Sequence, residues 1–188
     1  MPPELYEQTY QNKGHFSFGK NWQEFLRTLN AERIENARQS LAEFFGGHTS
    51  VSGKTFVDIG CGSGLFSLAA YRLGAAKIVS VDIDQFSLKC TEYLWEKEGR
   101  PAHWEIRKGS ALDAPFLRSL GTFDLVYSWG VLHHTGNMYH ALDNILPLGH
   151  AKSFWYLALY NDNPRLLEGT SALWVTLKRL YNKSPWLG

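Results

Sequence analysis

A chain of 188 residues with 44% hydrophobic and 14% aromatic residues fits one globular domain that buries a substantial core. Nineteen Lys and Arg are scattered among eighteen Asp and Glu, so the net charge of +1 provides little attraction to nucleic acid or to an acidic membrane. Two cysteines argue against a disulfide framework, and the sequence has neither a leader pattern nor a run of about 18 apolar residues. We therefore expect a cytoplasmic protein without a nucleic-acid or membrane partner.

The first part of the chain is predicted to be helical. Apolar residues recur at helical spacing between residues 22 and 45, with Asn30 as a cap between two helices, and Gly46-Gly47 ends the segment. The aromatic stretch HFSFGKNW (15–22) precedes it, and can either pack as a staple before the first helix or fold over a site as a lid. We expect residues 1–50 to form a helical cap or lid and residues 51–188 to form an α/β domain.

From residue 54 onwards, predicted strands alternate with predicted helices. Strands are expected at 54–60, 77–82, 103–109, 123–129 and 153–160, and helices at 65–75, 84–99, 115–120 and 137–146. Strands separated by helices form parallel βαβ units with right-handed crossovers. The predicted fold class is therefore α/β, with an open, doubly wound and mainly parallel sheet.

The stretch VDIGCGSGLF (57–66) places three glycines between a predicted strand and a predicted helix. Their spacing is G-x-G-x-G, at Gly60, Gly62 and Gly64, whereas the dinucleotide fingerprint has its third glycine one position later. The acid before them, Asp58, would repel a pyrophosphate but can accept a hydrogen bond from a ligand's ammonium group, directly or through water. The turn is thus better suited to a cationic ligand than to a dinucleotide.

A second acid, Asp82, ends the next predicted strand, twenty-two residues after Gly60. A carboxylate at this position can bind both hydroxyls of a ribose, and no adjacent Arg is present to accommodate a 2′-phosphate. The predicted ligand therefore contains an unphosphorylated ribose.

From about Phe56 to Tyr160 the chain resembles the class I S-adenosylmethionine-dependent methyltransferases, whose fold is Rossmann-like. The resemblance rests on the glycine turn, on Asp82, on KGSALDAPF (108–116), which is similar to the adenine-lining segment of the family, and on FDLVYSWGVLHH (123–134), which is similar to its fourth strand and following loop. It implies S-adenosylmethionine as cofactor. The implied cofactor-binding residues are Asp58, Gly60, Cys61, Gly62, Gly64, Asp82, Ile83, Ser110, Ala111, Leu112, Ser128 and Trp129.

Simpler interpretations accompany these assignments. The glycines can serve only as a tight connection, Asp84 is better explained as a helix cap, and Cys61 as a small turn residue. A metal site at His133-His134 is disfavoured, because neighbouring side chains diverge and no carboxylate or cysteine lies at ligand spacing. One of these histidines is instead expected either to face the pocket as acid, base or substrate contact, or to be structural.

The resemblance predicts transfer of a methyl group to a small-molecule acceptor by in-line displacement, with alignment as the main source of catalysis and His133 or His134 as the base where one is needed. The alternative is a non-catalytic S-adenosylmethionine-binding module, or a fragment of a longer protein, that supports a partner; a nicotinamide oxidoreductase is disfavoured by the glycine spacing. The family usually adds two strands after the fifth, whereas residues 166–188 are predicted to form one helix. The fold is therefore expected to lack its last two strands, and the open sheet edge would allow self-association.

Overall fold

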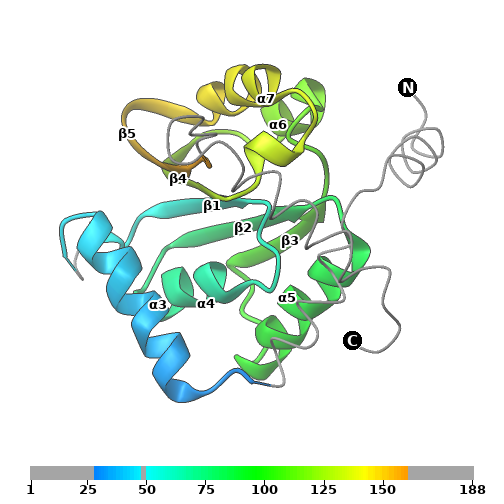
Figure 1. The fold of residues 1–188 in the computed structure, drawn as a ribbon. Helices are drawn as coiled ribbons and strands as arrows, with labels where there is room; N and C mark the ends of the chain where they lie inside the picture. The colour runs from blue at the N-terminus through cyan, green and yellow to red at the C-terminus, as the bar shows by residue number, and fades with distance from the viewer. Residues whose placement is uncertain (1–27, 48–49, 161–188) are drawn as a thin grey trace, which may run out of the picture.

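The computed structural model describes residues 28–47 and 50–160 (Figure 1). Within them no helix is long and apolar enough to cross a bilayer. In chain order the helices and strands are α3 (Ala31–Phe44), β1 (Thr55–Ile59), α4 (Leu65–Arg72), β2 (Lys77–Asp82), α5 (Gln85–Lys97), β3 (Trp104–Lys108), α6 (Ala114–Ser119), β4 (Phe123–Trp129), the 3-10 turn η2 (Leu132–His134), α7 (Met138–Ile145), the 3-10 turn η3 (Leu146–Leu148) and β5 (Gly149–Ala158).

The five strands form one parallel sheet in the order β3-β2-β1-β4-β5. The chain builds the sheet outward from β1 to β3 and then returns to the other side of β1 with β4. Loops that leave the carboxyl ends of β1 and β4 therefore run in opposite directions, which opens a crevice where doubly wound sheets bind ligands. The predicted doubly wound parallel sheet is confirmed.

Helices cover both faces of the sheet. Figure 1 shows α3, α4 and α5 on one face and α6 and α7 on the other. A core cluster beneath the first group contains Phe56, Leu68 and Leu125, and a second cluster beneath α6 and α7 contains Val57, Val126 and Ile145. Adjacent strand residues thus divide between the two cores, as the alternation of side chains along a strand requires.

Polar side chains begin four of the helices. Asn30, Asp84, Asp113 and Asn137 each accept a hydrogen bond from a backbone N–H in the first turn of α3, α5, α6 and α7. These contacts confirm the predicted caps at Asn30 and Asp84. The described part of segment 1–50 is α3, whose Leu41 is fully buried in the same core as α4. The remainder of the predicted cap or lid, residues 1–27, lies outside the described residues.

The start of β5 was predicted wrongly. This strand begins at Gly149, four residues before the predicted start, and a bulge separates the pairs Phe123–Gly149 and Leu125–Phe154. The extra residues, Gly149 to Lys152, include no large apolar side chain, so they carry no strand pattern, and Ser153 holds them by donating a 2.6 Å hydrogen bond to the carbonyl of Phe123. Within the described residues β5 pairs only with β4. The predicted helix at 166–188, and with it the expectation that the last two strands are lacking, falls outside the described residues.

Candidate functional site

The glycine turn follows β1 and has a geometry that only glycine adopts readily. Gly60, Gly62 and Gly64 have φ values of 77°, 55° and 78°, in the left-handed region. A Cβ on Gly60 would lie 2.9 Å from Cβ of Val131 and closer still to both of its methyl groups, and a Cβ on Gly64 would lie 2.7 Å from Oγ1 of Thr91. The turn is therefore packed against the loop after β4 and against α5.

Asp82 ties this turn to the end of β2. Its Oδ2 accepts a 2.9 Å hydrogen bond from the Gly62 N–H, and its Oδ1 accepts one of 2.8 Å from the Asp84 N–H. Burial raises the pKa of this carboxyl, while the two N–H donors oppose the rise. Each oxygen can accept a further bond. The carboxylate is thus fixed beside the turn with capacity left for ligand hydroxyls.

Asp58 points into the core beneath α4 and is only 2% exposed. Its Oδ2 accepts a 2.7 Å hydrogen bond from the Ser67 hydroxyl. Burial raises the pKa of Asp58 to about 7, against the lowering effect of the Ser67 bond. Sequence reasoning placed this acid before the turn but missed Ser67, although a serine within the apolar run LFSLAA is a visible signal.

The remaining residues predicted to bind the cofactor lie at the same carboxyl edge but differ in exposure. Ile83 and Trp129 are 44% and 48% exposed at the ends of β2 and β4. Cys61 is buried, with Sγ 3.4 Å from Oγ1 of Thr91. Its burial raises the thiol pKa, so it is a packed turn residue and not a thiolate.

The loop after β3 holds the three predicted adenine neighbours. The Ser110 hydroxyl accepts a 3.1 Å bond from the Leu112 N–H, and the Ala111 carbonyl accepts one from the Asn144 amide. Ser128, in β4, is fully buried and donates a 2.9 Å bond to the Ile59 carbonyl. Its hydroxyl therefore links β4 to β1, a structural role that the sequence did not indicate.

The two histidines follow β4 on η2, close to the glycine turn because Val131 packs on Gly60. The ring centroids of His133 and His134 lie 4.0 Å apart, so the expectation that these side chains diverge was wrong: the 3-10 turn brings them together. The ring centroid of Tyr160 lies 4.4 Å from that of His133. Both ring nitrogens of His133 are buried and have no hydrogen-bond partner among residues 28–47 and 50–160, and burial lowers its pKa. The neutral imidazole is a potential proton acceptor.

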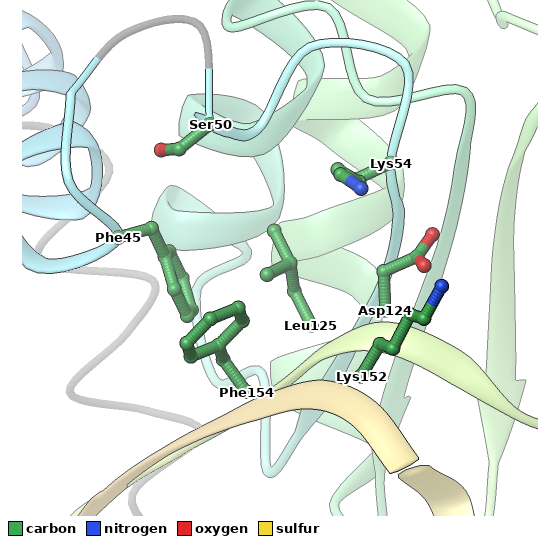
Figure 2. A pocket seen from close by; sticks show the side chains of 7 residues that line it. All are labelled: Phe45, Ser50, Lys54, Asp124, Leu125, Lys152 and Phe154. Atoms are coloured by element: carbon green, nitrogen blue, oxygen red, sulfur yellow. The ribbon is translucent and has the colours of Figure 1, made fainter. Parts of the chain in front are cut away.

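A separate hollow lies at the opposite, amino edge of the sheet. Figure 2 shows the rings of Phe45 and Phe154 at one end of it and the charged side chains of Lys54, Asp124 and Lys152 at the other. Its volume of about 180 Å³ is below the roughly 300–1,000 Å³ of ordinary ligand pockets. Doubly wound sheets bind ligands at the other edge, so we do not assign the site to this hollow.

The donor and acceptor set at the carboxyl edge fits the ligand expected from the sequence. Asp58 is a buried carboxylate and Asp82 a partly buried one, and neither forms an ion pair within the described part of the chain. Buried carboxylates of this kind are stabilised by a ligand that brings a positive charge and hydroxyl donors. S-adenosylmethionine carries both.

Comparisons with known proteins agree on one family. Residues 57–148 match the family described as methyltransferase domain. The chain is 45% identical over 56 residues to ribosomal protein L11 methyltransferase of Vibrio campbellii, a match that covers 30% of this chain and 19% of that relative.

Two solved structures share the fold. A putative S-adenosyl-L-methionine-dependent methyltransferase from Methanococcus maripaludis gives a TM-score of 0.62 at 19% identity, over 88% of this chain and 73% of the other. The YcgJ protein of Bacillus subtilis gives 0.60 at 17% identity, over 74% and 57%. The chain thus spans about a fifth of the curated relative and a larger part of both structures.

Proposed function

Because this chain belongs to the class I S-adenosylmethionine-dependent methyltransferases, we propose that it transfers the methyl group of S-adenosylmethionine to a nucleophilic atom of a protein. The observation that carries the proposal is the Asp82 carboxylate bound to the Gly62 N–H at the carboxyl edge of a doubly wound sheet. A pyrophosphate has no favourable place beside one buried and one partly buried carboxylate, whereas a cationic nucleoside does.

The acceptor expected from the sequence requires correction. A small molecule was expected, but the curated relatives are named as methyltransferases of ribosomal protein L11, which is a protein. The sequence motifs do not identify the acceptor, since the site residues that sequence reasoning identified are those assigned to the methyl donor. A protein acceptor is accordingly the class that we propose.

The residues have distinct roles in the proposed reaction. S-adenosylmethionine supplies a methyl group on a positively charged sulfur: the acceptor atom forms the new bond to carbon as the carbon–sulfur bond breaks. Asp82 would accept hydrogen bonds from ribose hydroxyls, and the buried Asp58 would attract the ammonium group, directly or through water, so that together they fix the donor. The loop 130–137 would exclude water and orient the acceptor, and the neutral His133 imidazole would take the acceptor's proton.

A labelling experiment tests the acceptor class. Two reactions each contain the protein and methyl-labelled S-adenosylmethionine. One receives a ribosomal protein fraction, and the other receives a protein-free metabolite extract. Label that becomes bound to protein, and accumulates more slowly when His133→Ala replaces the wild type, supports the proposal. Label found only in the metabolite extract contradicts a protein acceptor. Binding of the methyl donor without transfer to either fraction favours the non-catalytic module.

A further inference from the structure

A chain of buried hydrogen bonds crosses three strands and ends on Asp58. The Trp104 indole N–H in β3 donates to Oγ of Ser80 in β2 over 2.9 Å. The Ser80 hydroxyl donates to Oγ of Ser67 in α4 over 2.6 Å, and the Ser67 hydroxyl donates to Oδ2 of Asp58 in β1. All four side chains are at most 2% exposed. Water therefore does not compete for these bonds.

The direction of this chain is fixed by its first member. An indole N–H can only donate, so the Ser80 oxygen accepts and its proton is directed to Ser67. The Ser67 oxygen is then occupied as an acceptor, and its own proton is directed to Asp58. Every hydroxyl in the series thus points toward the carboxylate, and Asp58 receives the bond as an acceptor, which favours its ionised form.

The other groups facing Asp58 do not supply a counter-charge. Asp82 lies near enough to raise the pKa of Asp58, and Tyr127, its register partner on β4, has a buried hydroxyl without a hydrogen-bond partner within the described residues. Cys61 is a neutral thiol. The Ser67 bond is therefore the main contact that opposes the effects of burial and of Asp82 on the Asp58 carboxyl.

We propose that Trp104, Ser80 and Ser67 are positioning residues that hold Asp58 as an oriented carboxylate for the ammonium end of the methyl donor. This inference rests on the proposed function. It adds that affinity for the donor depends on the buried series of hydroxyls that ends on Asp58, and that this dependence is a function of pH.

The sign of the pH dependence follows from the charge on Asp58. The pKa of Asp58 lies near 7, so lowering the pH below this value protonates the carboxyl and removes its attraction for an ammonium group. Affinity for S-adenosylmethionine should therefore decrease as the pH falls below this value, and we call this decrease the acid limb of the affinity profile. Removing the Ser67 hydroxyl takes away a bond to the charged form, which raises the pKa further and moves the fall in affinity to higher pH.

The test is calorimetric titration of the full chain with S-adenosylmethionine between about pH 5.5 and 8.5, a range that spans the Asp58 pKa of about 7 and the shift expected for the variant. Ser67→Ala should bind S-adenosylmethionine about tenfold more weakly than wild type at pH 6.5, since a hydrogen bond to a charged group is lost. The midpoint of its acid limb should lie about one pH unit higher. Trp104→Phe keeps a large ring but removes the donor, and should shift the limb in the same direction by less. Ser67→Thr, which keeps the hydroxyl, should restore the wild-type limb.

Two controls separate positioning from general damage to the fold. Ser153→Ala removes a hydroxyl bound to the Phe123 carbonyl at the amino edge, and should leave the acid limb unchanged. The neutral nucleoside 5′-methylthioadenosine lacks the ammonium group, so its affinity should be the same for wild type and Ser67→Ala. An acid limb identical in wild type and in folded Ser67→Ala and Trp104→Phe would overturn the inference. Failure of the wild type to bind S-adenosylmethionine at any pH would instead overturn the proposed function.

Discussion

Replacing Gly60 by alanine tests whether the glycine turn and the loop after β4 form one packed unit. The φ of 77° costs a non-glycine residue about 1–2 kcal/mol. The added Cβ also overlaps Val131, and overpacking of this kind costs about 1–3 kcal/mol. The free energy of unfolding should therefore fall by about 2–5 kcal/mol, which for a protein of this size lowers Tm by roughly 4–20 °C.

Urea unfolding followed by circular dichroism measures this loss against two matched variants. Gly53→Ala has a similar φ of 72° but open space around the added Cβ, so it should lose only the backbone part. Combining Val131→Ala with Gly60→Ala should restore the part of the free energy of unfolding that is lost through overlap. A double-mutant cycle would show this as a favourable coupling energy. Equal losses for Gly60→Ala and Gly53→Ala, without coupling to Val131, would refute the packing of this loop on the turn.

Three further predictions address single side chains. Tyr127→Phe should raise the free energy of unfolding by about 1 kcal/mol in urea titrations, because it removes a buried hydroxyl with no partner among the described residues, and a clear loss would contradict this. The pKa of Asp124 is lowered chiefly by the Thr55 N–H, so the carboxylate stabilises the fold above its unfolded pKa of about 4 and loses this effect below it. Wild type should therefore have a higher Tm than Asp124→Asn at pH 7, and the two Tm values should converge as the pH falls below about 4. A difference in Tm that does not change with pH would be inconsistent with this. His133→Ala should slow methyl transfer while changing donor affinity less than about threefold, since the group acts on the acceptor; a collapse of affinity in calorimetry would place it in the donor site.

Local patterns predicted most of the fold. Strands β2 and β4 have their predicted bounds, because apolar runs between helical segments mark buried parallel strands, and Asn30 and Asp84 cap helices as short polar side chains do before an apolar run. The start of β5 was missed because Gly149 to Lys152 join the sheet through a bulge, which depends on side chains of β4 and not on a local repeat.

The site was predictable only where its signal lies in one stretch of sequence. The glycine turn and Asp82 are such signals, since backbone conformation and position after a strand define them. The bonds from Trp104 through Ser80 to Ser67 depend on the register of three parallel strands and on the seating of α4, which no local spacing reveals. The acceptor could not be predicted because the recognised motifs are those assigned to the methyl donor.

The most direct test of the account is calorimetric titration of wild type and Asp82→Ala with S-adenosylmethionine. Wild type should bind at one saturable site, and Asp82→Ala should bind at least about tenfold more weakly, because charge-assisted hydrogen bonds to the ribose, worth about 1.5–3 kcal/mol, are lost. Asp84→Ala is the matched control: it removes the neighbouring carboxylate that caps α5 and should leave affinity within about threefold. Equal affinity in wild type and folded Asp82→Ala would contradict the assignment of this edge of the sheet as the methyl-donor site.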